Sequence, residues 1–192
     1  MGERALGSHL TIEEYLAFEA GAEIRHEYHQ GEIFAMAGGT LNHSILGTNM
    51  LTELNLLGRR NGCTTFNGDM RIRIDSQNRF LYPEASVVCG PVETSNFDAD
   101  SIINPILIVE VLSESTEAYD RGEKFSLYRE LTPLQEYVLI SQDKAMVEVF
   151  LRKGEGIWEM RPYTGLDGEV ALSSLNAHIL MSDVYRNVEG LR

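Results

Sequence analysis

The sequence feature that most constrains the fold is a short apolar run that contains one carboxylate. In residues 104–113, Asn-Pro-Ile-Leu-Ile-Val-Glu-Val-Leu-Ser, the aliphatic residues follow one another without polar alternation. This pattern is typical of a strand that is buried on both faces. Glu110 lies inside the run, and an unpaired ionised carboxylate in such a place is strongly destabilising or becomes neutral through a raised pKa. The run therefore predicts a central strand whose acid is paired with a cation.

Lys124 is the candidate for that cation. It lies in Asp-Arg-Gly-Glu-Lys, residues 120–124, within a helix that we predict over 116–131 and that Pro133 cannot continue. On a helical wheel Lys124 shares a face with the apolar residues Leu127, Tyr128 and Leu131, at the spacings that put side chains on one stripe. That stripe must face inward, so the ammonium is predicted to point at the sheet that holds Glu110.

A second acid, Glu84, is predicted on a neighbouring strand. The strictly alternating segment 69–75 and the run 80–89 flank a turn at 76–78, which predicts a hairpin with Glu84 inside its second strand. Two carboxylates on neighbouring strands favour a hard divalent cation such as Mg²⁺, which takes one or two protein carboxylates and completes its shell with water and phosphate oxygens. Such an ion lowers the pKa of a bound water and stabilises charge on a phosphodiester.

The rest of the chain predicts one α/β domain over residues 1–192, with a mixed β-sheet flanked by helices. Thr11 and Glu14 form a capping box for a helix over 11–20. A second helix is predicted over 42–57, ended by Gly58 and followed by a turn at 59–62. Further expected elements are a strand pair over 25–37, a loop over 91–104, strands at 137–140, 146–151, 157–162 and 170–175, and a helical turn at 182–188.

Composition gives expectations about the location of the protein, the state of its cysteines and its binding partners. No segment of the 192 residues is apolar enough to span a bilayer, and residues 1–10 lack the apolar core of a signal peptide, so we expect a cytoplasmic protein. Cys63 and Cys89 are far apart and form no C-x-x-C motif, which favours reduced thiols. The net charge of −13 opposes non-specific binding to nucleic acid, but it suits a chain that binds divalent cations, and equally one that is merely soluble.

The motifs around the two acids resemble those of a large bacterial family of the PD-(D/E)xK, restriction-endonuclease-like superfamily, formerly a family of unknown function. The likeness extends from the first predicted helix to the closing strands and is most specific over 105–128. The segments that carry it are Tyr82-Pro83-Glu84, Val109-Glu110-Val111-Leu112-Ser113, Ser115-Thr116, Asp120-Arg121-Gly122-Glu123-Lys124 and Leu127-Tyr128.

The resemblance implies an endonuclease that hydrolyses DNA with Mg²⁺ or Mn²⁺ and acts as a homodimer. Glu84 stands where the family has Asp, and Glu110 occupies the second acidic position. The superfamily lysine normally follows two residues later, where this chain has Leu112, so Lys124 resembles a migrated equivalent. By the same analogy the carbonyl of Val111 is a metal ligand.

Other residues are weaker candidates. Glu27 matches an acidic position near the Gly31-Glu32 element of the family and, with His43, is a possible supporting residue of the metal site. For His43, helix capping or packing is the alternative. DNA contacts are expected first at two basic pairs, Arg59–Arg60 and Arg71/Arg73, for which a solvated surface is the alternative.

Three non-nuclease interpretations stay open at this stage. Glu110 and Lys124 can form a purely structural buried ion pair, since such pairs also occur without catalysis. With Glu in place of Asp at position 84, the chain can equally be a weakened or inactive nuclease fold that serves as a binding module. A glycosidase built on Glu84 and Glu110 is a distant third, because no aromatic residue lies beside them to stack on a sugar.

Overall fold

The computed structural model describes residues 9–36 and 38–192. The expectation about a signal peptide, which concerns residues 1–10, falls mostly outside these ranges, as does Ala37, the last residue of the first predicted strand pair. Within them, none of the helices is both long and apolar enough to cross a membrane.

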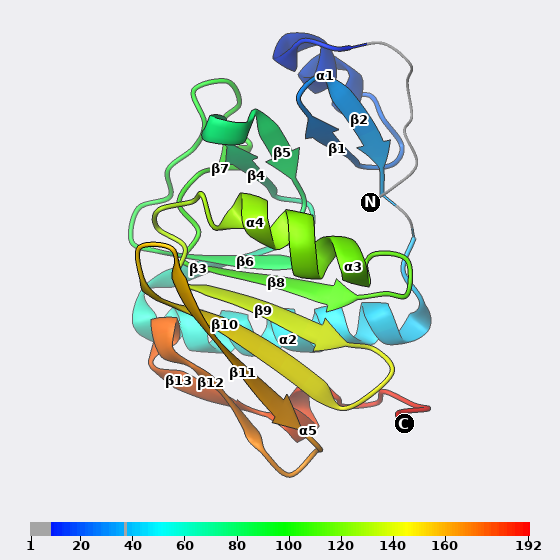
Figure 1. Ribbon diagram of the computed structural model, residues 1–192, viewed down its shortest axis with the longest axis vertical. Helices are drawn as coiled ribbons and strands as arrows, with labels where there is room; N and C mark the ends of the chain where they lie inside the picture. Colours follow the sequence, from blue (N-terminus) through cyan, green and yellow to red (C-terminus); the bar gives the residue numbers. More distant parts are fainter. Residues whose placement is uncertain (1–8, 37) are drawn as a thin grey trace.

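The largest sheet has six strands in the order β11-β10-β9-β8-β6-β3 and forms the centre of the molecule (Figure 1). Its β8–β9 pair is parallel and its other pairs are antiparallel, so it is the mixed sheet that the sequence predicts. Its strands are β3 (Cys63–Asn67), β6 (Ala85–Cys89), β8 (Leu107–Leu112), β9 (Glu136–Ser141), β10 (Met146–Gly154) and β11 (Ile157–Thr164).

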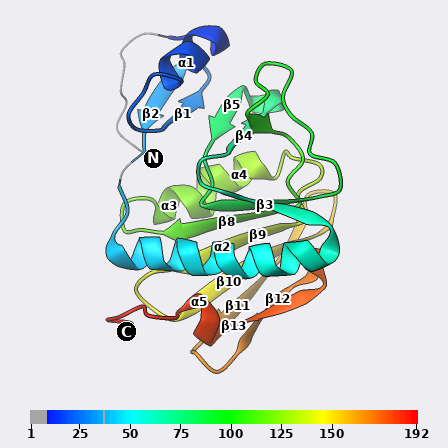
Figure 2. The same ribbon diagram turned by 180° about the vertical axis from the view of Figure 1, so that it is seen from behind.

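Helices cover both faces of this sheet. Helix α2 (Leu41–Asn61) runs along one face, as Figure 2 shows from behind. The opposite face carries α3 (Glu117–Tyr119), a π-helical turn η2 (Asp120–Lys124) and α4 (Phe125–Tyr128). Strand β8 is buried along its whole length, and its residues alternate between the two sides: Val109 packs in the cluster with α2, and Ile108 in the cluster with α4.

Two smaller sheets complete the fold. A five-stranded sheet has the order β2-β1-β5-β4-β7, and α1 (Ile12–Glu19) packs Tyr15 against it. A hairpin of two strands and α5 (Met181–Val184) close the core beside α2. The strands of these sheets are β1 (His26–His29), β2 (Glu32–Ala35), β4 (Arg71–Ile74), β5 (Arg79–Leu81), β7 (Ser101–Ile102), β12 (Glu169–Leu172) and β13 (Ala177–Leu180), with 3-10 turns η1 (Asp75–Gln77) and η3 (Ser173–Leu175).

Local signals in the sequence explain several boundaries. The capping box of Thr11 and Glu14 is formed as predicted. The first strand pair turns at Gln30 and Gly31, whose φ angles of 51° and 102° lie in the region that glycine adopts without strain. The predicted closing strands are present as β9, β10, β11 and β12, although residues 173–175 form η3.

The predicted end of the second helix is wrong. Helix α2 continues to Asn61 and ends at Gly62, which has the left-handed φ of 66°. Gly58 is instead a buried interior residue, where an added Cβ would lie 3.1 Å from the carbonyl oxygen of Cys63. The turn expected at 59–62 is therefore the last turn of the helix, and the glycine at 58 serves close packing against β3.

The predicted strand over 80–89 is also wrong, because it is two strands in different sheets. Residues 79–81 pair with β4 in the five-stranded sheet, whereas 85–89 pair with β3 and β8 in the central sheet. Tyr82, Pro83 and Glu84 cross between the sheets. Pro83 has no N–H for a ladder hydrogen bond, which explains why pairing stops there.

The expectation of two reduced cysteines is contradicted as well. Cys63 and Cys89 form a disulfide, since they are directly opposite each other in the antiparallel β3–β6 pair. Their separation in sequence, 26 residues, says nothing about this pairing, which depends on strand register.

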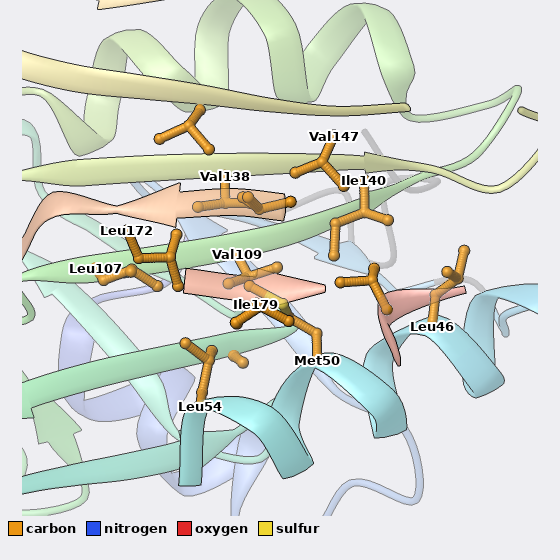
Figure 3. Close-up of a cluster of buried hydrophobic side chains, with 14 of the residues drawn as sticks. Leu46, Met50, Leu54, Leu107, Val109, Val138, Ile140, Val147, Leu172 and Ile179 are labelled. Atoms are coloured by element: carbon orange, nitrogen blue, oxygen red, sulfur yellow. The ribbon is translucent and has the colours of Figure 1, made fainter. Parts of the chain in front are cut away.

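The core against α2 generates the first testable prediction. Leu54 is fully buried between α2 and the sheet (Figure 3). Replacing it with alanine removes apolar contacts and leaves a cavity, so Leu54→Ala should lower the free energy of unfolding by about 2–5 kcal/mol. The neighbouring exposed residue gives the control: Asn55→Ala should change it by less than about 0.5 kcal/mol in the same urea titration. Equal effects would contradict the placement of α2.

Candidate active site

Lys124 is buried at the centre of a cluster of carboxylates. Its ammonium Nζ lies 2.8 Å from Oε1 of Glu110, 3.1 Å from Oε1 of Glu27 and 3.9 Å from Oδ1 of Asp120. It also donates a hydrogen bond of 3.1 Å to the carbonyl oxygen of Tyr82. The inward orientation predicted from the helical wheel is confirmed: the side chain of Lys124 is only 6% exposed.

The cluster joins elements from distant parts of the chain. Glu110 comes from β8, Glu27 from β1 of the five-stranded sheet, and Asp120 and Lys124 from the π-helical turn η2. Such π-turns within helices occur frequently at functional sites. Here the turn places Lys124 and Asp120 on the side of the helix that faces both sheets, so one ammonium lies between acids of two sheets.

Tyrosines and backbone groups complete the environment of the two glutamates. The hydroxyl of Tyr128 donates to Oε1 of Glu110 at 3.1 Å. The hydroxyl of Tyr119 donates to Oε2 of Glu27 at 3.3 Å, and the backbone N–H of Tyr82 lies 3.4 Å from Oε1 of Glu27. Both glutamates are therefore held by several donors in a site that is almost closed to solvent.

The environment separates the pKa values of these two acids. Burial raises the pKa of Glu110 to about 8: the charge of Lys124 lowers it in part, and the nearby Asp120 carboxylate adds to the rise. Burial also acts to raise the pKa of Glu27, but Lys124 and His29 outweigh it and lower the pKa to about 2. Two acids around one lysine with such different protonation are typical of an active site, although structural ion-pair networks also shift pKa values.

Lys124 itself stays positively charged. Desolvation disfavours the ammonium, but Glu110, Glu27 and Asp120 together raise its pKa well above the ordinary value of 10.5. At neutral pH the side chain can therefore donate hydrogen bonds and stabilise negative charge, and it has no free lone pair with which to accept a proton.

Glu84 lies apart from the Lys124 cluster. Its carboxylate faces α2, with Oε2 3.7 Å from Nε2 of His43, and its side chain is 31% exposed. Among the ion pairs of the described residues, none joins Glu84 to Lys124. Its backbone nonetheless meets β8, because the N–H of Glu84 donates to the carbonyl of Val109 at 3.0 Å. The structure thus brings Glu110, Lys124 and Glu27 together and pairs Glu84 with His43.

The strand break at Pro83 leaves the carbonyl group of Val111 without a partner residue in β6. The β6–β8 ladder ends at the Ala85–Val109 pair. Carbonyl groups two residues apart on a strand point the same way, so that of Val111 faces the same side as that of Val109 but lies beyond the last residue of β6. It is therefore available to a ligand at the end of this ladder.

These donors fit a hard divalent cation. When Glu110 is ionised, three carboxylates share one ammonium, and the buried cluster then carries an excess of negative charge that a cation can balance. Within residues 9–36 and 38–192, no three Asp, Glu, His or Cys side chains converge as a ready metal site. Mg²⁺ does not require such a group, because it binds one or two protein carboxylates together with carbonyl or water oxygens, whereas a structural Zn²⁺ site needs four protein ligands.

The predicted basic face of Arg71 and Arg73 is not solvated. Arg71 pairs with Asp98 at 2.7 Å, and Arg73 pairs with Asp75 at 2.7 Å while its guanidinium lies 4.5 Å from the centre of the Phe80 ring. Arg73 is 3% exposed. The alternation in the sequence suggested solvent exposure, but β4 lies between two strands of its sheet and both of its faces are covered. The Arg59–Arg60 pair is exposed, as expected.

Sequence reasoning missed Asp120, Tyr119, Tyr128 and His29 as parts of the site. Helical spacing offered a signal for the first and third, since each is four residues from Lys124. No local signal indicated Tyr119 or His29. Both contact Glu27 of β1, and the place of β1 depends on its pairing with β5.

The fold of this chain is similar to that of a protein whose crystal structure is known. A crystal structure of "a putative nuclease belonging to DUF820" from Anabaena variabilis superposes with a TM-score of 0.74, at 18% sequence identity, over 92% of this chain and 97% of that one. The restriction-endonuclease-like α/β fold predicted from the sequence is therefore confirmed.

Sequence comparison then gives the family. Residues 12–179 match Uma2, described as "putative restriction endonuclease". Two uncharacterized proteins of Synechocystis sp. are each 35% identical to this chain. The match with slr1290 covers 93% of this chain and 93% of slr1290. The match with sll1609 covers 85% of this chain and 93% of sll1609. The chain belongs to the Uma2 family of restriction-endonuclease-like proteins.

The buried cluster predicts a strong dependence on Lys124. Replacing it with methionine leaves buried carboxylates without their cation, so Lys124→Met should lower the free energy of unfolding by about 3–5 kcal/mol. Lys153, whose side chain is 42% exposed, is the matched control, and Lys153→Met should have an effect below about 0.5 kcal/mol. Urea unfolding followed by circular dichroism measures both; a small effect at position 124 would contradict the buried geometry.

The raised pKa of Glu110 predicts how stability depends on pH. Between pH 4.5, its ordinary pKa, and about 8 the folded protein holds the Glu110 proton while the unfolded chain has lost it. Stability should therefore fall as the pH rises through this window. In Glu110→Gln this part of the pH dependence should disappear. The lowered pKa of Glu27 acts in a separate window, with stability lost as the pH falls from 4.5 toward 2. An unchanged slope between pH 5 and 8 in Glu110→Gln would refute this assignment.

Proposed function

We propose that this protein is an endonuclease that hydrolyses DNA phosphodiester bonds with Mg²⁺ or Mn²⁺. The observation that carries the proposal is the buried lysine shared by three carboxylates beside the end of the β6–β8 ladder. Membership of a family described as "putative restriction endonuclease" supports the same chemistry.

Glu110, Glu84 and the carbonyl of Val111 would hold the cation. Glu110 and the Val111 carbonyl lie at the same end of β8, and Glu84 is carried by the adjoining strand crossing. His43, which faces Glu84, supports that carboxylate. A bound Mg²⁺ supplies Lewis acidity toward the phosphate and a water of lowered pKa.

Lys124 has the role of a fixed donor and positive charge. Its raised pKa makes it a group that orients the attacking water or binds a phosphate oxygen on which negative charge develops. Glu27 also contacts the ammonium, at 3.1 Å, and so helps to position it. Because the surrounding site excludes solvent, these hydrogen bonds are stronger than they would be in water.

DNA and a second copy of the chain are the proposed partners. Since Arg71 and Arg73 are occupied by Asp98 and Asp75, the exposed Arg59 and Arg60 at the end of α2 are the better candidates for phosphate contacts. A homodimer would bring one active site to each strand of a duplex, so we propose that the active form is a homodimer in the cytoplasm.

A plasmid assay tests the proposal. Purified protein should convert supercoiled plasmid to nicked or linear DNA with Mg²⁺ or Mn²⁺, and Glu110→Ala and Lys124→Ala should lower the rate by about 100-fold or more. Glu130→Ala and Lys153→Ala, which alter exposed residues of the same types, should cleave like the wild type. Equal cleavage by all variants would show a contaminating nuclease and reject the assignment.

One observation favours a second candidate function, a binding module without catalysis. Lys124 is already fully paired with carboxylates and a carbonyl, so the cluster can serve as a polar lock between the two sheets. Thermal unfolding separates the candidates. An ion that binds the native state at 100 times its Kd stabilises it by about 2.7 kcal/mol, which raises Tm by about 5–11 °C for a chain of this size. The nuclease proposal expects such a rise with Mn²⁺, whereas the lock predicts none.

A further inference from the structure

Gly47 lies in the middle of α2, where glycine is a poor helix former. The side chain of Glu84, which packs against α2 at this position, explains why glycine is present. A Cβ added to Gly47 would lie 2.7 Å from Oε1 of Glu84, 3.2 Å from its Cγ and 3.3 Å from its Cδ. The outer half of the Glu84 side chain therefore occupies the space that a side chain at position 47 would fill.

His43 is the second residue of α2 that contacts the Glu84 side chain. It lies one helical turn before Gly47, so both are on one face of α2. Its Nε2 is 3.7 Å from Oε2 of Glu84, while Oε1 rests on Gly47. Each carboxylate oxygen thus faces a different residue of the helix, and the side chain is held although it is only partly buried.

We infer that Gly47 is a positioning residue for Glu84, and that its missing side chain is matched to the length of a glutamate. This inference rests on the proposed function in assigning Glu84 to the cation site. An aspartate at position 84 is one methylene shorter and leaves the space beside Gly47 unfilled, and an alanine at position 47 fills that space.

The atoms in the way of a new Cβ are the end of a flexible side chain, not backbone. Gly47→Ala should therefore displace the Glu84 carboxylate and leave the helix intact. Because alanine is the better helix former, the Tm of Gly47→Ala should equal or exceed that of the wild type. Unchanged stability combined with altered cation binding distinguishes a positioning role from a general packing role.

Calorimetric titration with Mn²⁺ on the full chain tests the inference. Gly47→Ala should raise the Kd by about 10-fold to 100-fold, the usual effect of losing a residue that orients a ligand. The double variant Gly47→Ala/Glu84→Asp should recover most of this loss, since the shorter acid leaves room for the Cβ. Thr48→Ala, an exposed position on the same helix, is the control and should bind Mn²⁺ like the wild type.

The outcomes separate this inference from the proposed function. Wild-type affinity in Gly47→Ala, together with weak binding by Glu84→Ala, overturns the inference and leaves Glu84 as a ligand. If the wild type binds no Mn²⁺, the proposed function fails, and the inference about Gly47 is then tested on the metal-free protein. In that case Gly47→Ala should shift the NMR signals of the His43 ring at fixed pH as Glu84→Ala does, and unshifted signals overturn the inference.

Discussion

The ammonium of Lys124 is the contact on which the arrangement of this protein depends. It lies between Glu110 of the central sheet and Glu27 of the five-stranded sheet, and it also binds the backbone that crosses between these sheets at Tyr82. A charge this deeply buried is stable only when its partners are placed accurately. The same interaction therefore fixes the helix, joins the sheets and concentrates acidic groups in one site.

The cluster around Lys124 contains more carboxylates than ammonium groups. Three carboxylates share one lysine, and the cluster responds by keeping the pKa of Glu110 near 8 while that of Glu27 falls to about 2. The carboxylate that the lysine cannot neutralise is the group to which the proposed cation would bind. The strand end at Val111 and the partly exposed Glu84 provide further oxygen atoms at the border of the cluster.

The sequence predicts those parts of the site that depend on local patterns. Glu110 is identified by the apolar run around it, and the orientation of Lys124 by the spacing of its apolar neighbours. The contact with Glu27 depends on how two sheets meet, and the Cys63–Cys89 bond on strand register, neither of which a local pattern reports. The single strand expected over 80–89 is wrong because Pro83 cannot donate a ladder hydrogen bond and the chain changes sheets there. That error also put Glu84 in a regular strand, whereas its carboxylate faces α2.

Anomalous diffraction from crystals soaked in Mn²⁺ tests the central claim most directly. A bound Mn²⁺ should give one strong peak within about 2.5 Å of a Glu110 carboxylate oxygen and near the carbonyl of Val111, a distance typical of oxygen ligands. A density map with Lys124 still bound to Glu110 and Glu27 and with no peak at this end of β8 would contradict it, and would leave the cluster as a structural lock.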